Sequence, residues 1–322
     1  MRDNKYTPED LKIMQSWSLD RKIQVTQTRI IEWYQRNDGK VYVSFSGGKD
    51  STVLLALARQ LYPNIEAVFF DTGLEYPEIR EFVKTVPNVT WIKPEMNFRK
   101  VIEKYGYPVI SKEVGKRVYW GRKYINENGR VGEWAYKSLT KPSYTKDGKR
   151  SPYDKHKYGF LLDAPFNISD QCCYVMKKDP AHKYEKKTGK KPILATMAQE
   201  SQMRTINWLK YGCNAFEAVY PSSKPMSFWT EQDVLRFLYE AKIPYASVYG
   251  DIICENGKYH TTGYSRTGCV FCGFGCHIEK EPNRFQRLKQ THPKLWNYCM
   301  KPWDEGGLGM KEVLDYIGVK YE

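Results

Sequence analysis

The amino-acid sequence predicts an α/β protein with a doubly wound parallel sheet, a basic insertion and a cysteine-rich C-terminal region. Short apolar segments over 41–45, 65–70 and 89–92 have the composition of strands, and helical patterns over 51–61 and 78–86 separate them. Two strands joined by a helix within about 30 residues form a right-handed crossover, so neighbouring strands run parallel. Hydrophobic residues make up 41% of the chain, which excludes the intrinsically disordered class.

Further elements complete this organisation. Thr230 and Asp233 have the spacing of a capping box, which marks the start of a helix. Besides the elements above, the sequence predicts a helix over 11–35, a strand over 192–196, and helices over 199–211, 231–241 and 310–317. The expected segments are an N-terminal helical segment (1–36), an α/β core (37–111), a basic aromatic insertion (112–165), the remainder of the core with the first cysteine pair (166–245) and a cysteine-rich region (246–322).

Positive charge is concentrated in one stretch. Lys and Arg number 51 against 37 Asp and Glu among the 322 residues, which gives a net charge of +14. Residues 112–157 contain 13 basic and five acidic side chains and so supply +8 of that charge. A basic surface with interleaved aromatic rings is typical of nucleic-acid binding, and a solvated face is the alternative. The aromatic residues concerned are Tyr119, Trp120, Tyr124, Trp134, Tyr136 and Tyr144.

The sequence predicts a soluble, cytoplasmic protein. It contains no run of about 18 apolar residues, and residues 1–6 lack the apolar stretch of a signal peptide, so we expect no membrane partner. Disulfides seldom persist in a reducing compartment. The eight cysteines therefore indicate thiols, metal ligands or redox chemistry.

The segment Ser-Gly-Gly-Lys-Asp-Ser at 46–51 has the features of a phosphate-binding loop. It follows a strand and precedes a helix, which places its backbone N–H groups at a helix N-terminus, where partial positive charge favours phosphate. The two glycines let the backbone close on phosphate oxygens. Lys49 can neutralise those oxygens, Ser46 and Ser51 can donate hydroxyl hydrogen bonds, and Asp50 can hold Mg²⁺.

This loop resembles the Ser-Gly-Gly-x-Asp-Ser loop of the Rossmann-like ATP pyrophosphatases, the PP-loop family, and within them the phosphoadenosine phosphosulfate (PAPS) reductase family. Asp-Thr-Gly at 71–73, Glu-Ser-x-x-Arg at 200–204 and the stretch from Pro225 to Val234 match further family motifs. The resemblance implies an adenine-nucleotide site for ATP with Mg²⁺. Its expected residues are Ser44, Ser46, Gly47, Gly48, Lys49, Asp50, Ser51, Asp71, Thr72, Gly73, Glu200, Ser201 and Arg204.

Two cysteine pairs resemble those that hold a [4Fe–4S] cluster in assimilatory adenylylsulfate reductases, namely Cys172 with Cys173 and Cys269 with Cys272. Zinc is the main alternative for four thiolates, and unliganded thiols are another. Cys276 could replace one ligand or act as a free thiol. In the reductases a nucleophilic cysteine lies in the C-terminal region, beyond the second cysteine pair. Cys299 lies at a similar distance beyond Cys272, although the residues next to it do not match the nucleophile motif.

The lead hypothesis is an enzyme that splits ATP to AMP and pyrophosphate, with Lys49 and Asp50 in catalytic roles, and so activates an acceptor for sulfur insertion. The resemblance implies it because the loop is intact, the reductase nucleophile motif is absent, and Ala-Thr-Met at 195–197 replaces a Gly-x-Arg of the reductases. The implied partners are a nucleic-acid acceptor on residues 112–157 and a sulfur or electron donor, and a homodimer is plausible.

Two alternatives remain open at this point. One is a phosphoadenylyl or adenylyl sulfate reductase that releases sulfite, with Cys299 or Cys276 attacking sulfur. The other is a regulator that binds nucleotide and nucleic acid without turnover.

Overall fold

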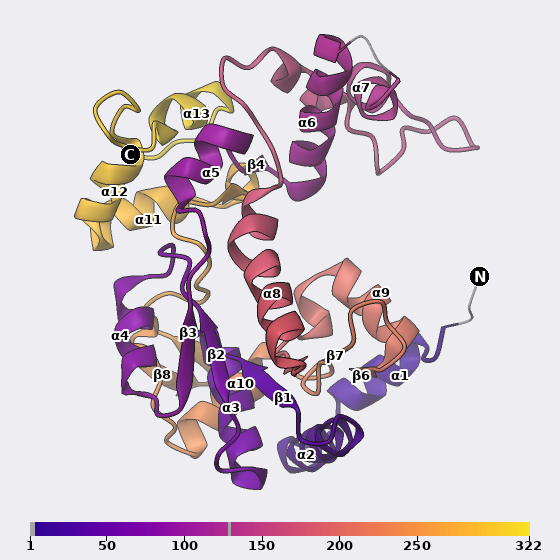
Figure 1. Ribbon diagram of the computed structural model, residues 1–322, viewed down its shortest axis with the longest axis vertical. Coiled ribbons are helices and arrows are strands. Elements are labelled where there is room, and N and C mark those ends of the chain that lie inside the picture. Colours follow the sequence, from indigo (N-terminus) through magenta and orange to yellow (C-terminus); the bar gives the residue numbers. More distant parts are fainter. Residues whose placement is uncertain (1–3, 128–129) are drawn as a thin grey trace. The chain divides into compact units, whose positions relative to one another are not determined.

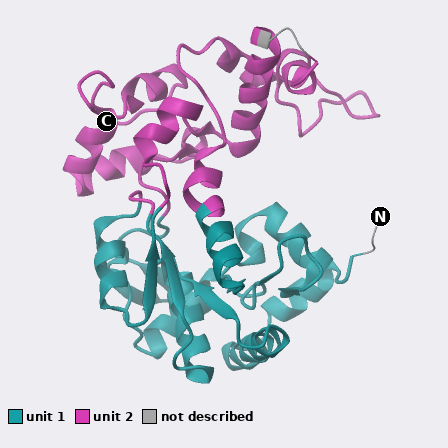
Figure 2. Ribbon diagram, viewed as in Figure 1, with its two compact units in different colours: residues 1–71, 75–93, 180–267 teal, residues 72–74, 94–179, 268–322 magenta. Residues whose placement is uncertain are grey.

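The structure is a computed structural model that describes residues 4–127 and 130–322. Figure 1 shows the helices and strands along the chain, which folds as two units (Figure 2). Unit 1 consists of residues 1–71, 75–93 and 180–267, and unit 2 of residues 72–74, 94–179 and 268–322. The expected cysteine-rich region 246–322 is therefore divided, because residues 246–267 belong to unit 1. Residues 1–3 and 128–129, within the expected segments 1–36 and 112–165, lie outside the described residues.

Unit 1 contains a six-stranded sheet in the order β3-β2-β1-β5-β7-β6, parallel except for the antiparallel pair of β6 and β7. The strands are β1 (Val41–Ser44), β2 (Ala67–Phe70), β3 (Val89–Ile92), β5 (Lys191–Ile193), β6 (Asn214–Ala215) and β7 (Ser222–Ser223), and β8 (Ile252–Glu255) with β9 (Lys258–Thr261) forms a separate hairpin. The helices are α1 (Pro8–Gln15), α2 (Leu19–Arg36), α3 (Lys49–Leu61), α4 (Pro77–Thr85), α8 (Asp179–Thr188), α9 (Gln202–Tyr211) and α10 (Glu231–Glu240). The first residue of α8, Asp179, belongs to unit 2, and the rest of that helix belongs to unit 1.

The buried strand β1 and helix α3 explain why the sequence folds this way. Val41, Tyr42 and Val43 are consecutive and all buried, as expected for a parallel strand covered on both faces. In α3, Val53 and Leu54 are fully buried, and the helix packs against both α2 and α10. The predicted α/β fold with a mostly parallel central sheet is confirmed.

The prediction of one helix over 11–35 is wrong, because two helices occupy this stretch. The α1 helix ends at Gln15, and α2 starts at Leu19. The hydroxyl of Ser18 accepts a hydrogen bond from the backbone N–H of Arg21 and so caps the new helix. The apolar periodicity continues across the break, which is why the sequence pattern gave no sign of it.

Unit 2 is mostly helical around a two-stranded parallel pair of β4 and β10. Its elements are α5 (Phe98–Tyr105), β4 (Val109–Ile110), α6 (Lys112–Glu127), α7 (Glu133–Thr140), β10 (Gly273–Phe274), α11 (Arg284–Thr291), α12 (Pro293–Met300) and α13 (Met310–Tyr316). Arg99 and Tyr107 donate to the carbonyls of Trp303 and Leu308, at 2.7 Å each, and so hold the two chain segments of the unit together. Among the described helices of both units, none is long and apolar enough to cross a membrane.

The basic insertion is more regular than its sequence suggests, because α6 and α7 form a packed helical pair. Gly115 and Gly121 look like helix breakers but lie at close contacts. A Cβ at Gly115 would approach the backbone of Ser169 to 3.1 Å, and one at Gly121 would approach the side chain of Leu162 to 3.1 Å. The two glycines thus do not end α6. They allow the helix to pack closely against Ser169 and Leu162.

Candidate nucleotide and cysteine sites

The predicted phosphate loop connects the end of β1 to the start of α3. Ser51 Oγ donates to the carbonyl of Gly48 at 2.9 Å and accepts from the N–H of Ser46 at 3.2 Å, which ties the loop closed. Gly47 has φ +71°, and a Cβ there would lie 2.6 Å from Val83 Cγ2. Only glycine therefore fits this turn. Ser44 is the last residue of β1 and is half-buried just before the loop.

Tyr249 and Thr267 also belong to this site, although sequence reasoning missed them. Gly48 is the N-cap of α3 and supplies no side-chain cap. The Lys49 N–H donates to Tyr249 Oη at 3.3 Å, and that hydroxyl is 2.6 Å from Thr267 Oγ1. Burial raises the pKa of Tyr249 to about 12, so the hydroxyl stays neutral. It occupies a position where a helix N-terminus can bind an anion.

The side chain of Lys49 is buried between two carboxylates. Its Nζ is 3.1 Å from Glu231 Oε1, at the start of α10, and 3.8 Å from Asp50 Oδ1. Only 4% of the Lys49 side chain is exposed. Glu231 is a third residue that the sequence did not single out. A bound phosphate would share or replace this carboxylate as the partner of Lys49.

Asp50 has the chemistry expected of a cation ligand. Its Oδ1 is buried and has no hydrogen-bond partner. Burial raises the pKa of this carboxyl, and the charges of Lys49 and Arg266 oppose that rise. A buried carboxylate oxygen without a hydrogen bond is costly unless a ligand compensates it. Because Mg²⁺ prefers oxygen ligands, Asp50 fits the expected role in holding the metal.

The Glu-Ser-x-x-Arg stretch contributes charge to the same unit. Glu200 forms an ion pair with Arg204, and Arg266 NH2 lies 4.0 Å from Glu200 Oε1. Burial lowers the pKa of Arg204, and the neighbouring charge of Arg266 adds to that effect, whereas Asp50 opposes it. Ser201 accepts from the N–H of Arg204 as the N-cap of α9. Two arginines therefore lie close enough to Asp50 for their charges to interact with it.

The Asp-Thr-Gly stretch follows β2. Asp71 is buried, and Arg80 NH2 donates to its Oδ2 at 2.9 Å. Thr72 Oγ1 accepts from the N–H of Leu74 at 3.2 Å, and Gly73 has φ +72°, which is the geometry of a tight turn. Thr72 and Gly73 group with unit 2, so their part in the nucleotide site stays a prediction.

The four predicted cluster cysteines all lie in unit 2. Cys172 and Cys173 open a helical segment that runs through a π-helical turn at Tyr174–Lys178. Their Sγ atoms are 4.0 Å apart. Cys269 and Cys272 share a turn in which the N–H of Cys272 donates to the Cys269 carbonyl at 3.1 Å. All four are thiols outside any disulfide.

The charges of these thiols interact across the two pairs. The pKa of Cys172 is raised by its hydrogen bond to Cys173, by burial, and by the thiols of Cys272 and Cys269. The pKa of Cys173 is lowered to about 6 by the hydrogen bond from Cys172, helped by Lys112 and Lys177. Four thiols within electrostatic range have the donor chemistry of a [4Fe–4S] cluster, whose electron-transfer ability would be its contribution. Within residues 4–127 and 130–322, no three ligand-type side chains group tightly enough to hold a metal ion.

Cys276 and Cys299 are poorly placed to act as nucleophiles. Cys276 is buried, its Sγ donates to the carbonyl of Gly273 at 3.0 Å, and burial raises its pKa to about 12. Cys299, in α12, is 0% exposed, and burial raises its pKa as well. A nucleophilic cysteine needs an accessible thiolate. Both thiols are buried and protonated at neutral pH, and the roles expected for them stay predictions.

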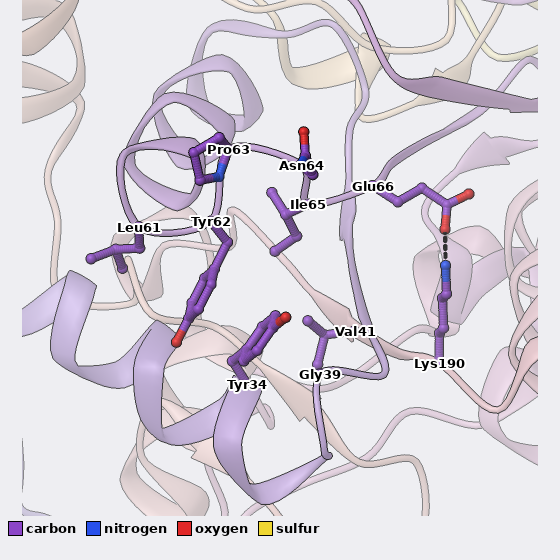
Figure 3. A pocket seen from close by; sticks show the side chains of 10 residues that line it. All are labelled: Tyr34, Gly39, Val41, Leu61, Tyr62, Pro63, Asn64, Ile65, Glu66 and Lys190. Carbon is purple, nitrogen blue, oxygen red and sulfur yellow. Dashed lines mark hydrogen bonds and ion pairs between the residues drawn. The ribbon is translucent and has the colours of Figure 1, made fainter.

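A pocket of about 340 Å³ lies where β1 and β2 begin, at the opposite strand ends from the loop of residues 46–51; Figure 3 shows its lining. Val41 at the start of β1 and Glu66 just before β2 line it, and Glu66 forms an ion pair with Lys190. The rings of Tyr34 and Tyr62 stack with centroids 3.7 Å apart. Ligands of open parallel sheets bind at the carboxyl ends of the strands. This pocket is at the opposite ends and is therefore separate from the candidate nucleotide site.

Comparison with known proteins finds one matching family model and several distant relatives. Residues 40–121 match the family model of the phosphoadenosine phosphosulfate reductase domain. An uncharacterised protein of Methanocaldococcus jannaschii is 25% identical over 302 residues, which cover 88% of this chain and 53% of the relative. A second one from that organism matches over 41% of its length, so the chain spans about half the length of these two relatives.

Two further comparisons involve proteins with named activities. The adenosine 5′-phosphosulfate reductase of Staphylococcus epidermidis is 21% identical over 252 residues, which cover 76% of this chain and 74% of that protein. The crystal structure of the PAPS reductase from Candida auris aligns with a TM-score of 0.39 and 14% identity, over 76% of this chain and 92% of that one. The loop, the sheet and the family-model match over residues 40–121 make this part of the chain similar to the PAPS reductase family of PP-loop proteins.

Proposed function

We propose that this protein is an enzyme that binds ATP and Mg²⁺ at the loop of residues 46–51 and splits ATP to AMP and pyrophosphate. An oxygen atom of the acceptor attacks the α-phosphorus, the bond to the β-phosphate oxygen breaks, and pyrophosphate leaves. The adenylated oxygen then departs with AMP when a sulfur nucleophile from a donor displaces it. The proposed acceptor is a nucleic acid, in keeping with the positive charge of residues 112–157.

The observation that carries this proposal is the pairing of Lys49 with Asp50 in an intact loop. Asp50 Oδ1 is buried and lacks a hydrogen-bond partner, while Lys49 Nζ lies 3.8 Å away. A carboxylate that holds Mg²⁺ beside an ammonium that binds phosphate suits the departure of pyrophosphate, because both neutralise charge on the leaving group. A protein that only binds a ready-made sulfonucleotide has no such need for a metal ligand.

The cysteine quartet supports a sulfur-related role. We propose that Cys172, Cys173, Cys269 and Cys272 hold a [4Fe–4S] cluster that assists sulfur delivery, with zinc as the alternative occupant. The hydrogen bond from Cys172, together with the charges of Lys112 and Lys177, lowers the pKa of Cys173 and favours its thiolate form, which is the form that binds metal. The expected cluster would give the anaerobically purified protein an absorption band near 400 nm, and a colourless protein that contains zinc would favour the alternative.

The test is product analysis after anaerobic purification. The protein is incubated with ATP and Mg²⁺, and separately with adenylyl sulfate and phosphoadenylyl sulfate in the presence of a thiol donor. Pyrophosphate from ATP alone supports the proposal, and Lys49→Ala is expected to remove it. Sulfite from either sulfonucleotide, without pyrophosphate from ATP, would contradict it. Binding of ATP and nucleic acid with neither product would indicate the regulator.

The second candidate function is reduction of a sulfonucleotide. It is favoured by the relative named adenosine 5′-phosphosulfate reductase, which aligns over 76% of this chain. The burial of Cys276 and Cys299 counts against it, because a sulfonucleotide must reach the attacking sulfur. Sulfite release by the wild type would support this function. Its loss in Cys299→Ser would make Cys299 the attacking sulfur, and its retention would exclude Cys299 from that role.

A further inference from the structure

We propose that a basic pocket in unit 2 binds a phosphodiester group of the acceptor strand, an inference that rests on the nucleic-acid acceptor of the proposed function. The pocket has a volume of about 250 Å³. Its walls are the C-terminal end of α5, one face of α6 and the loop at Asn167 and Ile168. It is separate from the loop of residues 46–51 and from the four predicted cluster cysteines, none of which line it.

The face of α6 that lines this pocket is polar. Tyr119, Arg122, Lys123 and Asn126 follow one another at intervals of three, one and three residues, which places them on the same side of the helix. A helix face that only packs against a core is apolar. This face instead presents cations, an aromatic ring and an amide to an open pocket.

Three cations line the pocket. Lys104, Arg122 and Lys123 line it, and no carboxylate does so among the residues that the structure describes. Arg122 donates to the carbonyls of Leu161, Leu162, Ala164 and Phe166 at 2.5–3.0 Å. Carbonyls satisfy its N–H groups without neutralising its charge. Burial lowers the pKa of Arg122, and the charges of Tyr316 and Asp163, neither of which lines the pocket, oppose that effect.

The aromatic rings decide between a nucleic-acid strand and a free phosphate ion. Tyr105 and Tyr119 line the pocket next to the cations, and Lys104 Nζ lies 5.3 Å from the centroid of the Tyr105 ring. A free phosphate ion would need only the cations. Single strands are bound by aromatic rings that stack on bases beside cations that contact the backbone. The combination therefore favours a strand.

The experiment measures the affinity of the full-length protein for a fluorescent single-stranded oligonucleotide by anisotropy, at several salt concentrations. Lys104→Ala and Lys123→Ala are each expected to weaken binding about tenfold and to lower the salt dependence by roughly one phosphate contact. Tyr119→Leu is expected to weaken binding about tenfold, with the salt dependence unchanged. Lys294→Ala is the matched control, because Lys294 is exposed in unit 2, lies outside the basic residues 112–157 and does not line the pocket.

The outcomes separate this inference from the proposed function. If the wild type and both lysine variants bind the oligonucleotide with equal affinity, the pocket does not bind the strand. The proposed function would then still stand. If inorganic phosphate displaces the strand and Tyr119→Leu has no effect, the site binds free phosphate and the inference fails. If the wild type binds no oligonucleotide, the pocket and the nucleic-acid acceptor both fail, while pyrophosphate release still tests the reaction with ATP.

Discussion

Asp50 combines a structural cost with a functional role. Its Oδ1 is buried without a hydrogen bond, and burial raises the pKa of this carboxyl, so the folded protein disfavours the charged carboxylate. Lys49 and Arg266 offset part of this cost through their charges. A residue that costs stability in the free protein and can bind a cation is typical of functional sites.

Asp50→Asn is expected to raise the free energy of unfolding of the nucleotide-free protein at neutral pH by about 1 kcal/mol and to abolish pyrophosphate release. The folded pKa lies above the unfolded value of 3.8, so stability of the wild type falls as pH rises through that window. The gain in the variant should therefore grow with pH from about 4 and level off above the folded pKa.

Thermal unfolding of both proteins between pH 4 and 8 measures this gain, and Asp147→Asn serves as the control because Asp147 is exposed. A variant that is less stable than the wild type at every pH would contradict the assignment of Asp50 as an uncompensated charge.

At the scale of elements, helix α10 links the nucleotide site to the N-terminal part of unit 1. Its N-terminal residue Glu231 pairs with Lys49, and Asp233 closes the capping box with Thr230. Asp233 Oδ2 also lies 2.6 Å from Nζ of Lys22, which is only 2% exposed in α2. One turn of α10 thus holds two buried ammonium groups.

Asp233→Ala is expected to lower the free energy of unfolding by about 3–5 kcal/mol, because it leaves a buried ammonium unpaired and also removes the helix cap. The midpoint of urea unfolding measures the loss. Glu240→Ala, at the exposed end of the same helix where Glu240 pairs with Arg236, should change stability by less than about 1 kcal/mol. Similar losses in the two variants would refute this view of α10.

The sequence predicts elements well where the signal is local. The strand over 89–92 and the capping box of Thr230 and Asp233 are confirmed residue by residue. The break between α1 and α2 was missed, because a hydroxyl cap at Ser18 competes with an unbroken apolar pattern. The helices of the basic insertion were missed because Gly115 and Gly121 look like breakers until their close contacts are known.

The candidate site can be predicted from the sequence only in part, because some of its residues are far apart in the chain. The loop at 46–51 is contiguous and could be identified directly. Tyr249 lies 200 residues from Lys49 in the chain, and no local pattern connects them. The burial of Cys299 depends on the packing of α12 and was equally invisible in the sequence.

At the scale of the whole molecule, the nucleotide loop belongs to unit 1 and the cysteine quartet to unit 2. Chains with two units often unfold in more than one step. We expect scanning calorimetry of the anaerobic protein to give two transitions. MgATP at about 100 times its Kd should stabilise the transition of unit 1 by about 2.7 kcal/mol, and Cys269→Ser should lower only the other midpoint.

Cys254→Ser is the control for this experiment, because Cys254 is an exposed thiol in unit 1 and should shift neither transition. A single transition that both MgATP and Cys269→Ser displace would show that the two units unfold together and would refute the prediction.

The order of strands in the sheet also bears on how the chain is made. Val43 in β1 pairs with Ile193 in β5, so the centre of the sheet joins segments that emerge from the ribosome far apart in time. At translation rates of 5–20 residues per second, the gap of about 150 residues corresponds to roughly 8–30 seconds. During that interval β1 has no partner on its β5 side, and the nascent chain exposes an apolar strand edge that chaperones recognise.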